Sequence, residues 1–413
     1  MKKFLTMLLT VVLAVSSLGL FTACGGDEEQ QGGDEKIAAL ICLHGDNSSY
    51  DKNFIDAFKA ACKAKGLNEN QYTIVVDIPE EGSDCYDKAA EFADAGYKAV
   101  FADSFGHEAN MIKAAQEFPN VQFCHATGTA GGFLTTESKD DDKPANFHNA
   151  FASIYEGRYL AGVAAGLKLI ELYGEDITAD EAKIGYVGAH PFAEVISGYT
   201  SFYLGVKSIV PNTTMEVKYT YSWYDEAAEK ASALALIENG AKLVSGHADS
   251  SGVPTACKEK NVPNVFYNGV SNEDTFVIAS KINWQPYFEI MLDGVMNNKE
   301  IPADYTGTLE TGSVQITALG KAAAEGTQTK LDEVKAKLMS GEIKVFDCAT
   351  FTVNGAPLTE YLADVVDIGD YQGETNVIKT EDGKTFFAES FYRSAPYFNI
   401  IIDGITIGAD VKA

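Results

Sequence analysis

A repeated alternation of strand-like and helix-like segments, beginning at Lys36, constrains the fold of this chain most. Ile37–Leu43 (IAALICL) is an unbroken apolar run, which is typical of a strand buried on both faces of a parallel sheet. The next segment, 51–65, has the apolar spacing of a helix and ends at Gly66. Because this order recurs as far as residue 296, the sequence predicts an α/β fold of doubly wound, Rossmann-like parallel sheets.

The predicted elements form two series, separated by a long helix at 151–170. In the first series we expect strands at 72–78, 99–103 and 121–126 and helices at 86–95 and 108–117. In the second we expect strands at 183–188, 215–222, 242–247, 264–268 and 276–282, with helices at 192–209, 226–239, 253–260 and 284–296. Beyond residue 301 we expect strands at 305–316 and 344–353, a helix at 330–339 and then hairpins. Two such series predict two similar lobes with a cleft between them.

The amino terminus has the features of an export signal. Residues 1–23 combine two lysines with a short apolar stretch and small residues, which indicates a secretory signal rather than a membrane span. Phe21–Cys24 (FTAC) looks like a bacterial lipobox, in which Cys24 becomes lipid-modified; a cleaved signal with a coincidental cysteine is the alternative. Residues 24–36 are a polar, Gly-rich tether. We therefore expect an exported protein, anchored to the cell membrane by a lipid.

Composition argues against several classes of function. The net charge of −27 disfavours nucleic acid and anionic lipid as partners. The motifs GxxxxGK[ST], HExxH and GxSxG do not occur, and Gly128–Gly132 (GTAGG) precedes no predicted helix. We therefore expect no enzyme and no cofactor. The acidic run 137–143 lacks the pattern of a calcium loop, the histidines are not paired at helical spacing, and the cysteines show no metal-type spacing. We therefore expect no metal site, and free, buried thiols.

Aromatic and acidic residues gather where the predicted strands end. In open α/β sheets, ligands bind beyond the carboxyl ends of the strands. A single aromatic there is more often part of the core, but the number at these positions favours a ring sandwiched between two lobes. The residues are Asp46, Tyr50, Asp51, Phe54, Ser104, Phe105, His107, Trp223, Tyr224, Asp225, His247, Asp249, Tyr267, Asn268, Asn283 and Trp284. Asp225 is also placed to cap the following helix, which makes a structural role the better prediction for it.

Several segments carry a resemblance to a known family. They are SFG at 104–106, EFPNVQFCHATG at 117–128, YEGRYLAGVAAG at 155–166, KIGYVGAHPFAEVISG at 183–198, SWYDEAAEKASA at 222–233, GHADS at 246–250 and INW at 282–284. From about residue 37 to 296 the chain resembles the basic membrane protein family of ABC-transporter substrate-binding lipoproteins, relatives of purine nucleoside receptors. The resemblance implies a type-I periplasmic-binding-protein fold, in which two lobes joined by a hinge close on the ligand. We expect 37–150 with 272–303 in lobe 1, 151–271 with 304–346 in lobe 2, and an extension at 347–413.

The resemblance also implies the site. In nucleoside receptors of this family one aromatic from each lobe stacks on the purine, and the matching positions here are Phe54, with Tyr50 as a rival, and Trp223. The acidic residue after the first strand matches Asp46. Positions that face the cleft in such folds are Ser104, Phe105, Asp249, Asn268 and Trp284. The family often has an aspartate near Asn268, and this chain departs from it.

The sequence thus predicts a monomeric, lipid-anchored receptor. We expect it to capture a purine nucleoside or nucleobase and pass it to the permease and ATPase subunits of an ABC importer. A receptor of the same fold for another small molecule, such as a sugar or a signalling ligand, is the first alternative. A nucleoside-processing enzyme is the second, and a structural or adhesive surface role is the third. The sequence leaves open which purine is bound.

Overall fold

Two β-sheets organise the chain in the computed structural model, which describes residues 35–130, 144–365 and 374–409. In these residues the first sheet has six strands in the order β11-β5-β4-β3-β1-β2, all parallel to their neighbours. Their bounds are β1 (Ala38–Ile41), β2 (Tyr72–Val75), β3 (Ala99–Ala102), β4 (Gln122–Ala126), β5 (Phe147–Ala152) and β11 (Asp304–Gly307). β1, β3 and β5 are buried along their whole length, as strands of a parallel sheet covered on both faces should be.

The second sheet repeats this plan with seven strands among the described residues, in the order β12-β10-β9-β8-β6-β7-β17. Only β12 runs antiparallel to its neighbour. The bounds are β6 (Lys183–Gly188), β7 (Thr214–Tyr219), β8 (Val244–His247), β9 (Asn264–Tyr267), β10 (Phe276–Ile282), β12 (Val314–Ile316) and β17 (Ile405–Ile407). In each sheet the strand order reverses once, between β1 and β3 and between β6 and β8. The predicted pair of doubly wound sheets is confirmed.

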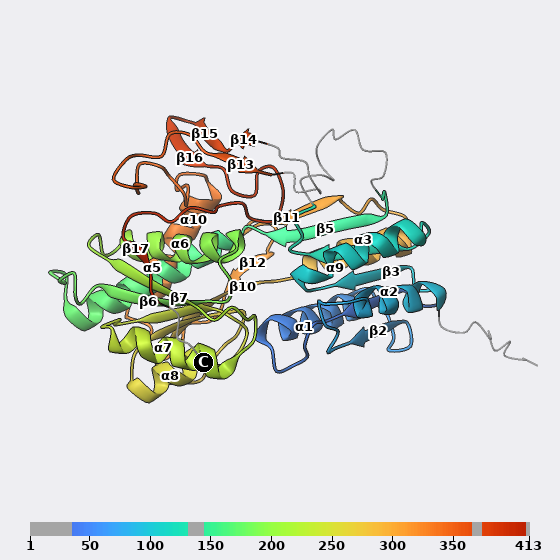
Figure 1. The fold of residues 1–413 in the computed structure, drawn as a ribbon, viewed down its shortest axis with the longest axis horizontal. Coiled ribbons are helices and arrows are strands. Elements are labelled where there is room, and N and C mark those ends of the chain that lie inside the picture. Colours follow the sequence, from blue (N-terminus) through green and yellow to red (C-terminus); the bar gives the residue numbers. More distant parts are fainter. Residues whose placement is uncertain (1–34, 131–143, 366–373, 410–413) are drawn as a thin grey trace, which may run out of the picture. The chain divides into compact units, whose positions relative to one another are not determined.

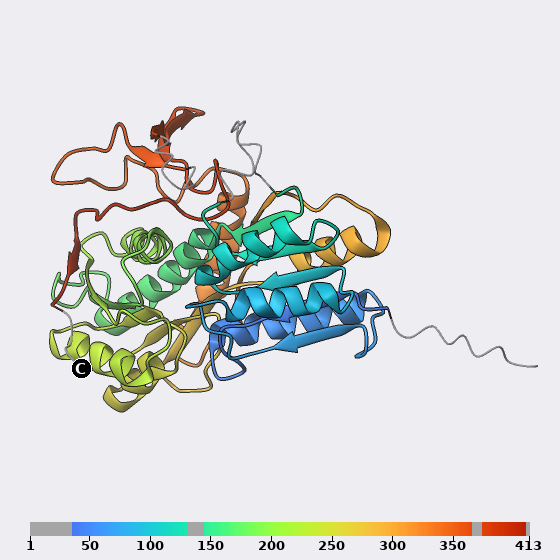
Figure 2. The ribbon, with the colours of Figure 1, turned by 45° about the vertical axis from the view of Figure 1, so that its right-hand side comes forward.

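Helices cover both faces of each sheet (Figure 1, Figure 2). On the first sheet α1 packs against α9, and α2 against α3; on the second α5 packs against α6, and α7 against α8. The bounds are α1 (Ser49–Ala64), α2 (Asp84–Asp94), α3 (Glu108–Glu117), α5 (Ile154–Tyr173), α6 (Ala193–Lys207), α7 (Glu226–Glu238), α8 (Gly252–Lys260) and α9 (Gln285–Asn297), with α10 (Thr327–Met339) beside α5. Asp225 caps α7 by accepting from the Ala228 amide at 2.9 Å, as expected.

The α5–α6 pair crosses at two glycines. A Cβ atom added to Gly162 would lie 2.2 Å from the Phe202 carbonyl oxygen, and one added to Gly205 would lie 2.2 Å from that of Tyr159. Neither position therefore accepts a side chain without separating the helices. Gly162 of α5 and Gly205 of α6 therefore let the two helices pack closely. Among the described residues no helix is both long and apolar enough to span a membrane.

Some strands differ from the sequence-based expectation. The expected strand at 305–316 is two strands, β11 in the first sheet and β12 in the second, because the chain crosses between the lobes at 308–313. β10, placed with residues 272–303 in lobe 1, pairs with β9 in the second sheet, and only α9 of that segment packs in the first lobe. β5 has no counterpart in the sequence-based expectation; its last two residues, 151 and 152, fall at the start of the expected helix 151–170, which begins at Ile154 instead. Residues 344–353 form turns and two isolated bridges instead of a strand.

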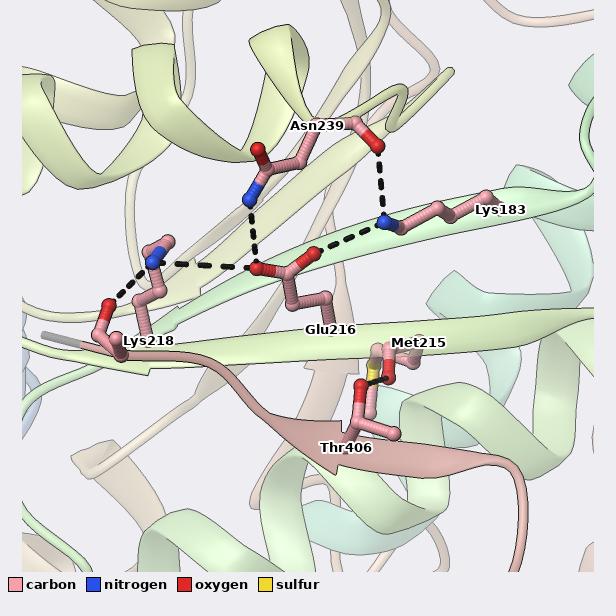
Figure 3. Close-up of polar contacts among 7 residues, drawn as sticks. Lys183, Met215, Glu216, Lys218, Asn239 and Thr406 are labelled. Carbon is pink, nitrogen blue, oxygen red and sulfur yellow. Dashed lines mark hydrogen bonds and ion pairs between the residues drawn. The ribbon is translucent and has the colours of Figure 1, made fainter.

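The carboxyl-terminal extension joins both lobes. Its two antiparallel pairs, β13 (Leu362–Asp364) with β14 (Glu374–Asn376) and β15 (Ile378–Glu381) with β16 (Lys384–Phe387), match the expected hairpin-rich region. Ser394 then contacts the first lobe, where its hydroxyl donates to Asp304 at 2.5 Å. β17 adds to the second sheet beside β7, where the Thr406 hydroxyl donates to the Met215 carbonyl at 3.3 Å (Figure 3).

Beside the same edge strand, the Glu216 carboxylate interacts with two lysines and one side-chain amide. It pairs with Lys183 at 2.9 Å and with Lys218 at 3.9 Å, and the Asn239 amide donates to it at 2.9 Å (Figure 3). Lys218 also donates to the Ala409 carbonyl, so β17 is held to β7 beyond the last strand residue. The second lobe thus has no exposed strand edge at β7.

The six cysteines within the described residues are free and buried, which confirms that expectation. They are Cys42, Cys62, Cys85, Cys124, Cys257 and Cys348. The export signal, Cys24, the tether and the acidic run 137–143 lie outside the described residues.

Candidate ligand-binding site

A small cavity of about 20 Å³ lies between the two lobes, at the strand order reversal of both sheets. The first lobe lines it with Leu43, Tyr50, Ser104, Phe105 and Thr127, and the second lobe with Glu194, Trp223, His247, Asp249 and Tyr267. These residues follow β1, β3, β4, β6, β7, β8 and β9, or end them. This is the place where open α/β sheets bind ligands. Because the cavity has room for little more than one water molecule, a ring-sized ligand needs the lobes to separate.

Tyr50 forms much of the first-lobe wall. It lies in the first turn of α1, which Ser48 caps by accepting from the Asp51 amide at 3.1 Å. The Tyr50 hydroxyl donates to the Asp103 carbonyl at 2.8 Å, which fixes the ring beside the end of β3. Its other side packs on Phe54, with ring centres 4.9 Å apart. Tyr50 therefore presents a supported aromatic face to the cavity.

Trp223 forms the facing wall in the second lobe, after β7. It packs edge-on to His190, with ring centres 5.0 Å apart, and His190 stacks on Phe192. Phe192 also contacts Phe105 of the first lobe, at 5.7 Å between ring centres. The aromatic groups of the two lobes therefore meet at one rim of the cavity.

Backbone contacts tie the lobes together beside the cavity. The Ser49 amide donates to the Asp249 carbonyl at 3.0 Å, across the cleft. The Asn53 side chain donates to Asn268 at 3.4 Å and to the Ile282 carbonyl. These bonds join the start of α1 to the ends of β8, β9 and β10. They describe a closed arrangement of the lobes.

Two residues at the cleft have left-handed backbone angles. Thr127, which lines the cavity, has φ = 66°, and Asn268 has φ = 56°. The left-handed region is unfavourable for a β-branched residue, so Thr127 needs its surroundings to hold it there. Its amide donates to the Ala150 carbonyl at 3.0 Å and its hydroxyl donates to the Ala126 carbonyl at 2.6 Å. Strain of this kind is common at functional sites.

Carboxylates give the cavity its electrostatic character. Burial raises the pKa of the Asp249 carboxyl well above its usual range, and the nearby carboxylates of Asp51 and Glu229 raise it further. Burial likewise raises the pKa of Asp103 well above its usual range, with Asp51 adding to the effect. A ligand that brings positive charge or hydrogen-bond donors relieves this cost at Asp249, which lines the cavity.

A buried network supports the second-lobe wall. His247 contacts Glu194, with 3.2 Å between Nε2 and Oε1, and burial together with the neighbouring Arg158 lowers the pKa of His247. The contact is therefore a hydrogen bond from a neutral imidazole. Arg158 is 1% exposed, donates to the Gly246 carbonyl at 3.1 Å and lies 3.7 Å above the Tyr267 ring. This cation–π contact helps to fix the orientation of the Tyr267 ring.

One buried group of three potential metal ligands lies near the first-lobe wall and consists of Cys42, Asp51 and Asp103. Each of the two carboxylates accepts a backbone hydrogen bond, and the second oxygen of Asp103 has no hydrogen-bond partner among the described residues. The His44 amide donates to Asp51 at 2.7 Å, and the Leu43 amide donates to Asp103 at 3.1 Å. The cluster therefore serves to fix the loop that leads from β1 to α1.

The structure brings five of the predicted site residues to the cavity: Tyr50, Ser104, Phe105, Trp223 and Asp249. Asp46 and Asn268, with Asp249, line an adjoining open groove of about 690 Å³. Phe54 and Trp284 do not reach the cavity. They are fully buried and stack on each other, with ring centres 4.2 Å apart.

Five further residues line the cavity and are not among the predicted site residues: Leu43, Thr127, Glu194, His247 and Tyr267. His247 and Tyr267 were noted at strand ends, and that position was the signal that could have selected them. Glu194 lies in the first turn of α6, directly after β6, and the strand order that makes this position central is not visible in the sequence. No sequence feature marks Thr127 as a site residue, because its position depends on its backbone angle.

Comparisons with known proteins agree with this architecture. Residues 36–348 match the profile of a protein family described as ABC transporter substrate-binding protein PnrA-like. A purine-binding protein of Brucella abortus is 28% identical over 68% of this chain and 75% of its own length. A protein of Haloferax volcanii, provisionally described as an ABC transporter glucose-binding protein, is 24% identical over 68% of this chain and 66% of its own. A solved structure, an ABC transporter solute-binding protein of Aeropyrum pernix K1, superposes with a TM-score of 0.61, at 15% identity, over 75% of this chain and 93% of that one.

Proposed function

The chain belongs to the PnrA-like family of ABC transporter substrate-binding proteins, and we propose that the solute it captures is a purine nucleoside or nucleobase. Its fold is the type-I periplasmic-binding-protein fold. Proteins of this class bind a small molecule outside the cytoplasm and work with the permease and ATPase subunits of an importer. The family and fold are those of transport proteins rather than enzymes.

The observation that carries the proposal is the pair of aromatic walls on opposite lobes. Tyr50 and Trp223 line one cavity from the two sides of the cleft. When the lobes part by the thickness of a ring, a planar base fits between these faces. Stacking on aromatic side chains stabilises a bound base by about 1–3 kcal/mol per contact. The purine-binding relative supports the same ligand class.

Capture then follows from lobe closure. The ligand binds to separated lobes and adds contacts to both walls as they close, so it stabilises the closed form by its difference in affinity for the two forms. Asp249 and Glu194 face the ligand as acceptors for its N–H or O–H groups. The permease of the importer then recognises the closed receptor.

Calorimetric titration with nucleosides, bases, sugars and amino acids tests the proposal. We expect purines alone to bind, and Trp223→Ala to weaken that binding at least about tenfold, because one stacking face is lost. Trp223→Phe keeps an aromatic face and should retain most of the affinity. Phe391→Ala is the control, since Phe391 is 58% exposed on the carboxyl-terminal extension. A screen without any purine response overturns the proposal.

A sugar is the second candidate, and the groove beside the cavity favours it. Its lining is mostly polar and includes Asn53, Asn268, Lys281 and Gln285, side chains suited to bonding hydroxyl groups. In the same titrations a sugar response that survives Trp223→Ala would support this candidate. Glucose belongs in the panel because the Haloferax volcanii relative is described by that ligand.

The lipid anchor completes the proposed function. We propose that Cys24, in FTAC, is the lipid-modified first residue of the mature protein and that 25–35 is the tether that follows it. Cys24→Ser should release the protein from the membrane fraction and abolish labelling by a fatty-acid analogue. Retention of membrane attachment by this variant would contradict the lipidation.

A further inference from the structure

The cavity offers hydrogen-bond acceptors, because the hydroxyl donors of its first-lobe wall are already bonded within the protein. Tyr50 donates to the Asp103 carbonyl at 2.8 Å, and Ser104 donates to Glu80 at 2.5 Å. Thr127 donates to the Ala126 carbonyl at 2.6 Å. These three hydroxyls therefore have no hydrogen left for a ligand.

Asp249 is the acceptor with the most to gain from a ligand. It is 7% exposed, and its carboxylate receives no hydrogen bond from any residue that the structure describes. Its main chain is held from both sides: the amide donates to the Trp223 carbonyl at 2.9 Å, and the carbonyl accepts from the Ser49 amide at 3.0 Å. The main chain of Asp249 is thus fixed between the two lobes, and the residue lines both the cavity and the adjoining groove.

Tyr267 supplies the complementary donor. Tyr267 lines the same cavity, and its hydroxyl oxygen is buried and has no hydrogen-bond partner among the described residues. The Arg158 guanidinium lies 3.7 Å from the centre of the Tyr267 ring and helps to hold the ring in place. The wall of the second lobe therefore presents a buried carboxyl group and one hydroxyl that can donate. Two N–H donors from a ligand would stabilise the ionised form of that carboxyl, which has two accepting oxygens.

We propose that this site selects 6-oxopurines, guanine and guanosine above all, with Asp249 accepting from the ring N1–H and the 2-amino group and the Tyr267 hydroxyl donating to O6. The inference rests on the proposed function. The Watson–Crick edge of guanine presents two donors and then an acceptor, which matches a carboxylate followed by a hydroxyl. Adenine presents its N1 as an acceptor, which would face the carboxylate without a proton between them.

The order of affinities follows from the groups on each base. Guanosine makes both bonds to Asp249, inosine lacks the 2-amino group and makes one, and 1-methylguanosine loses the N1–H and clashes at the same point. A paired contact of this kind discriminates between bases by about tenfold or more. We expect guanosine to bind tightest, inosine next, and adenosine and 1-methylguanosine at least about tenfold more weakly than guanosine.

Calorimetric titration of the mature protein with these four nucleosides tests the ranking without any mutation. Adenosine binding as tightly as guanosine, or 1-methylguanosine matching guanosine, overturns the assignment while purine capture stands. If no purine binds, the proposed function fails and this assignment fails with it. Failure of the guanine preference can therefore be told apart from failure of purine capture.

A substitution should invert the preference. Asp249→Asn offers one acceptor and one donor, which suits the 6-amino group and N1 of adenine. We expect guanosine affinity to fall at least about tenfold and adenosine to become the tighter ligand. Asp274→Asn makes the same change of charge at a side chain that is 85% exposed and paired with Lys321, and it should leave both affinities unchanged. An Asp249→Asn variant that melts like the wild type and keeps the guanosine preference overturns the role of Asp249.

Discussion

Tyr50 and Phe54 differ by one turn of α1, and that turn separates a cavity-lining ring from a core ring. Residues four apart on a helix share a face, so their rings touch. Tyr50, at the start of the helix, lies beside the cavity. Phe54 lies one turn deeper and is covered by Trp284. The position that matches the family's stacking residue is therefore occupied by a core side chain in this structure.

Matched leucine substitutions separate these roles. Tyr50→Leu should weaken purine binding by about tenfold, because it removes a stacking face worth about 1–3 kcal/mol. Phe54→Leu should lower the free energy of unfolding by about 1–3 kcal/mol and change the affinity of the folded protein by less than about twofold. Calorimetry and chemical denaturation measure the two effects. The opposite pattern would return the stacking role to Phe54.

Glu389 couples stability to pH. Burial raises the pKa of this carboxyl to about 7, above the unfolded value near 4.5. Between these values the folded protein keeps a proton that the unfolded chain releases, so the free energy of unfolding falls as pH rises, by at most about 1.4 kcal/mol per unit. Glu389→Gln should therefore gain stability relative to the wild type from about pH 4.5 to 7. Chemical denaturation of both proteins at each pH gives the difference between their free energies of unfolding, in which the contributions of other groups cancel. A difference that does not change with pH would contradict the raised pKa of Glu389.

At the scale of elements, β17 protects an edge of the second sheet that would otherwise be open. It pairs with β7 in parallel from Ile405 to Ile407, and bonds at both ends extend the contact. The strand is short and comes from the far end of the chain. The strand that it pairs with, β7, lies instead within the second predicted series of alternating strands and helices.

Thr406→Pro tests the contribution of this strand. Proline cannot donate to the ladder and its ring does not fit between paired strands, so we expect a loss of about 1–3 kcal/mol in the free energy of unfolding and more self-association through β7. Thr406→Val keeps the strand geometry and is the control. Thermal melting and light scattering provide the measurements. Equal melting temperatures for the two variants would show that β17 pairing contributes little.

Elements with a strong local pattern were predictable from the sequence, and elements defined by distant partners were not. β6, β10 and α3 have the predicted bounds, because apolar runs and helical spacing are local properties. Whether β10 belongs to one sheet or the other depends on its pairing with β9 and β12, which no local pattern encodes. The site follows the same division: Trp223 and Asp249 stand at recognisable strand ends, whereas Thr127 depends on a backbone angle and Phe54 on burial under Trp284.

At the scale of the whole receptor, closure depends on a few bonds between lobes. The Ser49 amide reaches across the cleft to Asp249, so its hydrogen can exchange only when the lobes part or the region unfolds. A ligand at 100 times its dissociation constant stabilises the bound form by about 2.7 kcal/mol. We therefore expect guanosine to slow exchange at Ser49 by up to about 100-fold. The Cys42 amide, bonded to Val75 within one lobe at 2.9 Å, is the control for a cleft-specific effect. Equal slowing at both amides would contradict hinge closure as its cause.

The sequence contains only two arginines, Arg158 beneath the cavity wall and Arg393 in the carboxyl-terminal extension, and both are buried. An arginine-specific protease therefore has no accessible cleavage point on the folded chain, although the surface carries many lysines. Cutting at Arg393 would report release of the extension, and cutting at Arg158 would report unfolding of the second lobe. Cleavage at each of the two arginines therefore reports local opening, and the order of cleavage would show which part of the protein opens first.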